Sequence, residues 1–218
     1  MYLLSQADAA LGRLAGAGRV LRDPNLLINS YLTQEAVSST RIEGTETSLT
    51  EVFKAEAAAG ESDDNVIEVT NYVRAMQVGV KRLEQLPICL RLVKEIHEIL
   101  LNGARGKEKR PGEFRTSPVW IGSPSDSPET ATFVPPLPGD ELVTALADWE
   151  KFANEDLRMP VLIRCALLHY QFETIHPFLD GNGRLGRLLI VFFLVQQGRL
   201  PGPLLYKRLP RKKPSRIL

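Results

Sequence analysis

The twelve-residue segment 176–187 contains the side chains of this sequence best suited to chemistry. It reads His-Pro-Phe-Leu-Asp-Gly-Asn-Gly-Arg-Leu-Gly-Arg and lies between two stretches of helical character. Gly181 and Gly183 can adopt positive φ, which lets consecutive backbone N–H groups converge on an anion. The helix that follows adds the partial positive charge of its N-terminus. His176 is the titratable group of the segment able to act as a base near neutral pH.

Two arginines and an aspartate indicate which anion the segment would bind. Arg184 and Arg187 are three residues apart in the first turn of the expected helix, so both guanidiniums can face one site. Two such clamps suit a di- or triphosphate better than a single carboxylate. Asp180 would be repelled by that anion unless a cation such as Mg²⁺ lies between them. Because the sequence lacks a Gly-x-x-x-x-Gly-Lys-Ser/Thr motif, it predicts a phosphoryl- or nucleotidyl-transfer site without a Walker lysine.

The pattern His-x-Phe-x-Asp-Gly-Asn-Gly-Arg-x-x-Arg, complete at 176–187, resembles the signature of the Fic family of protein adenylyltransferases. The resemblance implies that His176 deprotonates a target hydroxyl, which attacks the α-phosphate of ATP, and that Asp180 holds Mg²⁺. It also implies a set of nucleotide-binding residues: Gly181, Asn182, Gly183, Arg184 and Arg187. Related phosphotransferases carry lysine at the second glycine, so Gly183 argues against that branch, while phosphoryl transfer stays an alternative.

A second segment, Ser39-Thr-Arg-Ile-Glu43-Gly44, resembles the inhibitory motif of the same family. A carboxylate at the end of a helix is disfavoured by the helix dipole unless a cation meets it, and Arg187 would be that cation. The resemblance implies autoinhibition, with Ser39 and Glu43 as the inhibitory residues, Glu43 at the γ-phosphate clamp and the inhibitory helix at about 24–43. In some relatives the same glutamate supports hydrolytic removal of AMP.

Between residues 105 and 138 short β-prone runs replace helical periodicity and enclose a loop of turn-forming residues. This pattern predicts a β-hairpin, and the resemblance identifies it with the family's flap, at about 117–136. The exposed edge of a flap can pair with the main chain of a target protein. We expect five docking residues: Val119, Trp120, Ile121, Phe133 and Val134. A simple surface hairpin is the alternative.

We expect the two other histidines of the sequence, His97 and His169, to pack inside the protein or to lie at its surface.

The rest of the sequence is mostly helical. Apolar periodicity, the capping signals at Asp23-Pro24 and Ser48–Glu51, and glycine stops predict the helices. They span about 24–43, 48–60, 64–85, 88–102, 140–154, 160–174 and 183–198. The predicted fold class is mainly α, a Fic-type helical bundle with one β-hairpin. We divide the chain into N-terminal helices (1–60), a Fic core (61–205) and a basic tail (206–218).

Composition narrows the class of protein. The chain has 218 residues, of which 44% are hydrophobic and 24% charged, which excludes wholesale disorder. Its longest apolar run, Leu188 to Val195, has eight residues, whereas a membrane helix needs about 20. We expect neither a signal peptide nor a membrane span, and a cytoplasmic location. Two cysteines cannot build a disulfide framework or a cysteine-based metal site.

Charge is unevenly distributed along the chain. No acidic residue follows Asp180, whereas nine basic residues do, and the first 180 residues carry 18 basic and 26 acidic side chains. This asymmetry calls for an anion near the C-terminal part. Relatives usually continue beyond about Leu205. Two alternatives therefore stay open: a truncated, inactive relative that binds a nucleotide or partner, and a regulator that binds nucleic acid through the tail. The partners expected from the resemblance are target proteins, the chain itself as AMP acceptor, and a second copy in a homodimer.

Overall fold

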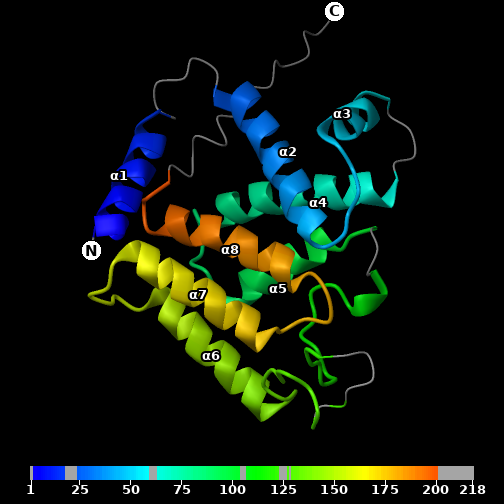
Figure 1. Cartoon of the computed structure of the whole chain (residues 1–218), viewed down its shortest axis with the longest axis vertical. Helices are drawn as coiled ribbons and strands as arrows, with labels where there is room; N and C mark the ends of the chain where they lie inside the picture. Colours follow the sequence, from blue (N-terminus) through cyan, green and yellow to red (C-terminus); the bar gives the residue numbers. More distant parts are fainter. Residues whose placement is uncertain are drawn as a thin grey trace, which may run out of the picture.

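The computed structural model describes residues 2–17, 24–58, 63–103, 107–122, 127 and 129–200. Within these ranges the regular secondary structure is helical, which confirms the mainly α class. The helices are α1 (Tyr2–Ala17), α2 (Pro24–Ile42), α3 (Leu49–Ala58), α4 (Asp64–Arg82), α5 (Leu90–Leu100), the 3₁₀ turn η1 (Lys107–Lys109), α6 (Asp140–Asn154), α7 (Val161–Ile175) and α8 (Asn182–Gln196) (Figure 1). No helix in the described ranges is long and apolar enough to cross a bilayer. The predicted tail, 206–218, lies outside the described residues.

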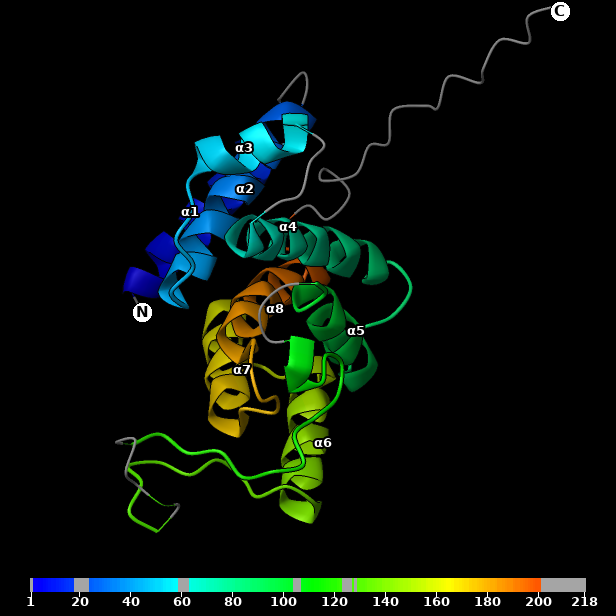
Figure 2. The same cartoon turned by 90° about the vertical axis from the view of Figure 1, so that its right-hand side faces the viewer.

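Helix α8 forms the centre of the bundle. It packs against α2, α4, α5 and α7, and Figures 1 and 2 show it near the middle of the bundle, among these helices. Its sequence is apolar around most of its circumference, as is typical of a largely buried helix. Leu185, Leu188 and Phe192 are fully buried. Gly79 of α4 faces the ring of Phe192 so closely that any side chain at this position would overlap it. The helix that begins in the signature segment is therefore packed against the core along most of its length.

Helix α2 ends beside the start of α8. It packs on α4 and α8, with Ala36 and Val37 in the core. Gly44 has a φ of 87°, its N–H donates to the carbonyl of Arg41 at 3.0 Å, and the N–H of Thr45 donates to that of Thr40 at 3.2 Å. These two bonds form a Schellman motif, in which a glycine in the left-handed region ends the helix. The predicted stop at Gly44 is thus correct, and it leaves Glu43 at the C-cap.

The predicted cap of α3 is also present. The backbone N–H of Ser48 donates to the Glu51 carboxylate at 2.7 Å, and the N–H of Glu51 donates to the Ser48 hydroxyl at 3.3 Å, which is a capping box. Helix α1 is additional to the helices expected from the sequence. Its residue Leu11 packs against the core, while Tyr2 and Leu3 stay exposed.

The predicted β-hairpin is not formed as a pair of strands. In the described part of 117–136 the two arms run antiparallel away from the helices (Figure 2) and are joined by one bridge, between Ile121 and Phe133. The tip, 123–126 and 128, lies outside the described residues. Pro118, Pro135 and Pro136 have no N–H to donate to a ladder, and a two-stranded ribbon without a third strand is only marginally stable. These two effects explain why pairing stops at one bridge.

Candidate active site

The loop from His176 to Gly181 joins α7 to α8, and its shape is set by two left-handed residues and by hydrogen bonds to its main chain. His176 caps α7 in the left-handed region, with a φ of 48°, and Gly181 caps α8 with a φ of 75°. A non-glycine residue in this region costs about 1–2 kcal/mol and persists only where its surroundings hold it. Asn182 contributes to this restraint, because its amide accepts from the N–H of Phe178 at 3.0 Å and donates to its carbonyl at 2.9 Å. The predicted nucleotide contact of Asn182 stays a prediction, and its amide is engaged by the loop.

Arg115 holds the same loop through a second set of hydrogen bonds. Its buried guanidinium donates to the carbonyls of His176 at 2.8 Å, Ile175 at 3.2 Å and Pro136 at 2.5 Å. Its backbone N–H donates to the carbonyl of Pro177 at 2.9 Å. Arg115 therefore fastens the end of α7 to the root of the flap, in agreement with its sequence position directly before the first flap arm.

The environment of His176 favours the neutral imidazole. Its side chain is half-buried, and burial is the main reason why its pKa lies below the ordinary value of 6.5. Arg115 lowers this pKa further, while the carboxylates of Glu43 and Asp180 act in the opposite direction. A neutral imidazole can accept a proton, which is the property that the predicted role requires.

Arg184 lies in the first turn of α8 with only 4% of its surface exposed. Its Nη2 lies 3.1 Å from Oδ1 of Asp180, and its Nη1 lies 3.6 Å from Oε2 of Glu68. Within the described part of the chain, its Nε and Nη1 have no hydrogen-bond acceptor. The hydroxyl of Thr45, directly after the α2 stop, donates to the Glu68 carboxylate. Buried donors without an acceptor are unfavourable by about 1–3 kcal/mol, so an anion at this helix N-terminus would satisfy them.

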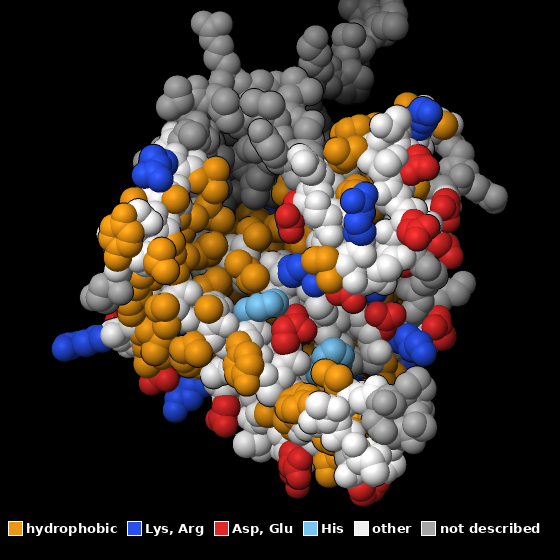
Figure 3. Space-filling view, viewed as in Figure 1, with side chains coloured by type: hydrophobic (Ala, Val, Ile, Leu, Met, Phe, Trp, Pro, Cys, Tyr) orange, Lys and Arg blue, Asp and Glu red, His pale blue; other side chains and the backbone are white. Residues whose placement is uncertain are grey.

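Arg187 lies one turn further along α8 and is held by α2. Its Nη2 forms an ion pair with Oε1 of Glu43 at 2.7 Å and donates to the carbonyl of Ser39 at 3.0 Å, and its Nε donates to the Ser39 hydroxyl at 2.6 Å. Gly183 lies directly under this pair, because a side chain there would overlap the Glu43 carboxylate. The contact predicted between the two segments, 144 residues apart, is therefore present. Figure 3 shows charged side chains gathered near the adjacent ends of α2 and α8, with apolar side chains over α1 and α7.

Asp180 is the predicted metal ligand. Its Oδ1 accepts from the N–H of Gly181 at 2.5 Å and from Arg184, and 40% of its side chain is exposed. Among the described residues no group of three or more histidines, cysteines and carboxylates could enclose a metal ion. Mg²⁺ usually keeps several waters and takes one or two carboxylates together with substrate phosphates. A single accessible carboxylate beside an anion site fits that kind of Mg²⁺.

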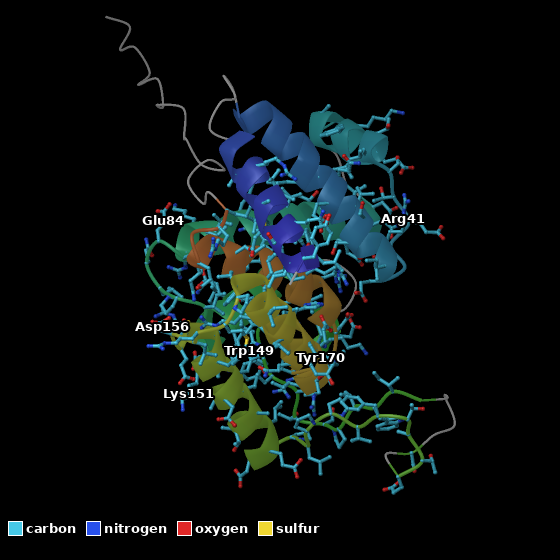
Figure 4. The ribbon with its side chains drawn as sticks, turned by 60° about the vertical axis from the view of Figure 1, so that its left-hand side comes forward. Arg41, Glu84, Trp149, Lys151, Asp156 and Tyr170 are labelled. Atoms are coloured by element: carbon cyan, nitrogen blue, oxygen red, sulfur yellow. The ribbon has the colours of Figure 1, made fainter. Side chains whose placement is uncertain are left out.

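The expected docking residues lie on the two flap arms. Trp120, Ile121 and Phe133 are exposed, and Val119 and Val134 are half-buried. Phe133 and Val134 line a hollow of about 700 Å³ against α6. A second hollow, of about 410 Å³, lies between α6 and α7 around Trp149, Lys151 and Tyr170 (Figure 4). Neither hollow is lined by a side chain of the segment 176–187.

The sequence gives no sign of two main-chain contacts of His97. The expected packing role is present, because His97 is fully buried and stacks on Phe178, but its ring also bonds to main-chain groups of Gly112 and Asp180. Burial lowers its pKa to about 4. The spacing of apolar residues along a helix predicts which side is buried, but it does not predict hydrogen-bond partners in other segments.

Comparison with known proteins assigns the chain to a family. The model of the Fic/DOC family N-terminal region matches residues 1–81, and the model of the Fic/DOC family matches residues 87–194. The chain belongs to the Fic/DOC family. Two curated relatives, each named protein adenylyltransferase Fic, come from Drosophila willistoni and Drosophila grimshawi. Both are 33% identical over 148 residues, or 66% of this chain, and the match covers 27% and 28% of the relatives. The chain thus spans little more than a quarter of these Fic proteins.

Solved structures of Fic proteins share the fold. A Fic domain containing signaling protein from Bacteroides thetaiotaomicron superposes with a TM-score of 0.71 at 20% identity, over 88% of this chain and 73% of that one. A Fic family protein from Desulfovibrio desulfuricans superposes with a TM-score of 0.67 at 25% identity, over 89% and 57% of the two chains. The predicted Fic-type bundle is therefore confirmed, apart from the strands of the hairpin.

Proposed function

We propose that this chain transfers AMP from ATP to a hydroxyl side chain of a protein, and that Glu43 restrains the transfer. The observation that carries the proposal is the Glu43–Arg187 ion pair of 2.7 Å over Gly183, at the start of α8 and close to the half-buried His176. Three features thus lie close together: an arginine and a helix N-terminus that could bind a phosphate, a histidine that could act as the base, and a carboxylate that competes with the phosphate. The naming of the curated relatives supports the same reaction.

The triphosphate would bind at the N-terminus of α8. The first N–H groups of a helix have no partner within the helix, and Gly181 and Gly183 leave room for an anion to reach them. Arg184 offers two buried N–H groups that lack an acceptor in the described chain, and Arg187 offers a guanidinium for the γ-phosphate. Asp180 would hold Mg²⁺, which neutralises phosphate charge when bound.

His176 would act as the general base. Its neutral imidazole takes the proton of the target hydroxyl while the oxygen attacks the α-phosphorus of ATP. A new phosphorus–oxygen bond joins AMP to the target as the bond to the β-phosphate breaks, and pyrophosphate leaves. Arg115 does not touch the reacting atoms, but its bonds to the carbonyls of Ile175 and His176 keep the base directed to the same place during this exchange.

Glu43 would inhibit by occupying the clamp rather than by blocking all nucleotide binding. Its carboxylate already forms the ion pair that the γ-phosphate would make with Arg187, and two bonds from Arg187 to Ser39 hold the clamp towards α2. ATP could still bind through α8 and Arg184. Its γ-phosphate would then be displaced by like charge, so that the α-phosphate is not aligned for in-line attack.

The flap would bind the target protein and hold its acceptor side chain near the site. Its exposed arms carry apolar side chains at Trp120, Ile121 and Phe133. With a single bridge between the described parts of the arms, main-chain groups there can pair with an extended segment of a target. The hollow beside Phe133 and Val134 offers space for a target side chain. The nucleic-acid alternative depends on residues 206–218, which lie outside the described chain.

Labelled ATP tests the reaction class. Self-labelling of the Glu43→Gly variant is measured with label on the α-phosphate and, separately, on the γ-phosphate. Label from the α-phosphate alone, lost in Glu43→Gly/His176→Ala, is expected. Label from the γ-phosphate would indicate phosphoryl transfer. No label from either, with ATP binding retained, would favour an inactive nucleotide-binding relative.

A further inference from the structure

We infer that His97 is a positioning residue of the proposed transfer site: it fastens the segment leading into the flap to the Asp180–Gly181 turn, and so sets where an acceptor hydroxyl meets the phosphates. The inference rests on the proposed function. It concerns a side chain on α5 that lies outside both the signature segment and the inhibitory motif.

Both ring nitrogens of His97 bond to main-chain groups. The N–H of Gly112 donates to Nδ1 at 2.8 Å, and Nε2 lies 2.9 Å from the carbonyl oxygen of Asp180. An amide N–H can only donate and a carbonyl can only accept, so Nδ1 is the unprotonated nitrogen and Nε2 carries the proton. The two partners define one neutral tautomer. One ring therefore bridges two segments that lie 15 and 83 residues away in the sequence.

One face of the ring is occupied as well. The ring of Phe178 stacks on it, with centroids 3.7 Å apart and an interplanar angle of 7°, and Phe114 leans on Phe178 at 5.2 Å. A Cβ on Gly181 would lie 3.4 Å from Nε2, so the turn runs directly over the ring edge. An apolar side chain could fill this space, but it could not form hydrogen bonds to the two main-chain groups.

The two bonds act at places that the proposed chemistry uses. Asp180 is the proposed Mg²⁺ ligand, and the next residue, Gly181, caps the helix that would receive the phosphates. Gly112 begins the stretch that runs through Arg115 into the first flap arm. Arg115 in turn bonds to Pro136, at the end of the second arm. His97 and Arg115 thus tie the two roots of the flap to the loop between α7 and α8.

Two substitutions separate the two ends of this bridge. In His97→Asn the side-chain oxygen falls near the place of Nδ1, so it can accept from Gly112, but nothing reaches Asp180. In His97→Gln the terminal amide falls near Nε2, so it can donate to Asp180, but Gly112 loses its acceptor. Each change removes one buried hydrogen bond, so the KM for the substrate held at that end of the bridge is expected to rise about tenfold.

Both variants are made in the Glu43→Gly background, with the His176→Ala chain as acceptor. His97→Asn is expected to raise the KM for ATP–Mg²⁺ about tenfold and to leave the KM for the acceptor within twofold. His97→Gln is expected to show the reverse. Val93→Ala, in the core on the same helix, is the control for loss of stability alone. If both variants change the two KM values alike, or if both match Val93→Ala, the inference is wrong.

Amide hydrogen exchange gives a readout that needs no activity. Protection of the Gly112 N–H should persist in His97→Asn and fall at least tenfold in His97→Gln. Equal protection in the two variants would show that no such bridge exists. No transfer by the Glu43→Gly parent would overturn the proposed function and with it the positioning role, whereas the exchange result would still decide the bridge itself.

Discussion

At the scale of single residues, an ion pair between Glu43 and Arg187 joins α2 to α8 at the site. The pair is partly exposed, with 20% of the Arg187 and 37% of the Glu43 side chain accessible, so its net contribution to stability is small. Its importance is positional, because it places a carboxylate on a cation that a phosphate would use. A weak contact of this kind can be displaced, as a reversible restraint requires.

Replacement of Arg187 tests whether both partners act through one contact. In Arg187→Ala the Glu43 carboxylate loses its partner and ATP loses a clamp, so adding Glu43→Gly should change the rate of AMP transfer less than twofold. ATP affinity should fall about tenfold, as for loss of one charge-assisted bond. Initial rates and nucleotide titrations measure the two effects. A large further rise in rate on adding Glu43→Gly would show that Glu43 restrains the enzyme by another route.

The pH dependence of transfer tests the assignment of His176. The base must be neutral to act, so the rate should rise with pH through its pKa and then level off. Because burial lowers that pKa below the ordinary 6.5, the midpoint of the acid limb should lie below 6.5. Removing Glu43, whose charge raises this pKa, should move it lower still. The pH profile of kcat/KM for ATP–Mg²⁺, which reports the enzyme without bound nucleotide, is measured in the wild type and in the Glu43→Gly variant. A midpoint above 6.5 would contradict the assignment.

At the scale of elements, the close approach of α4 to α8 holds the helix on which the site is built. In Gly79→Ala the added methyl group overlaps the Phe192 ring, and overpacking of this kind costs about 1–3 kcal/mol. The midpoint of thermal unfolding should fall by several degrees. Gly12→Ala is the matched control, because Gly12 is also helical but has no atom near the added methyl group. A similar effect in both variants would contradict this view of the packing.

Local sequence signals predicted these elements well where one chain segment decides the outcome. The Gly44 stop and the Ser48–Glu51 cap follow from residues within a few positions of each other, and both are present. The flap was predicted less well. Its β-prone runs indicated strands, but strands need neighbours, and within their described residues the arms are joined by one bridge, between Ile121 and Phe133.

At the scale of the whole molecule, the bundle brings together segments that are far apart in sequence. The resemblance of two motifs to one family was enough to predict that Glu43 meets Arg187. No motif signalled that His97 bonds to Asp180 or that Arg115 bonds to Pro136, because these contacts depend on how α5 and the flap roots pack around the loop. Single-sequence reasoning thus found the residues proposed to touch the substrate and missed much of what holds them.

The most direct test of the central claim compares three chains: the wild type, Glu43→Gly and the control Glu46→Gly. Glu46 is an exposed glutamate three residues further along, and the described part of the chain shows no bond from it to the site. Initial rates of labelling from α-labelled ATP are measured at equal protein concentration. The labelling rate is expected to rise at least tenfold in Glu43→Gly and to change less than twofold in Glu46→Gly. Equal rates in all three chains, with label incorporated, would contradict the restraint.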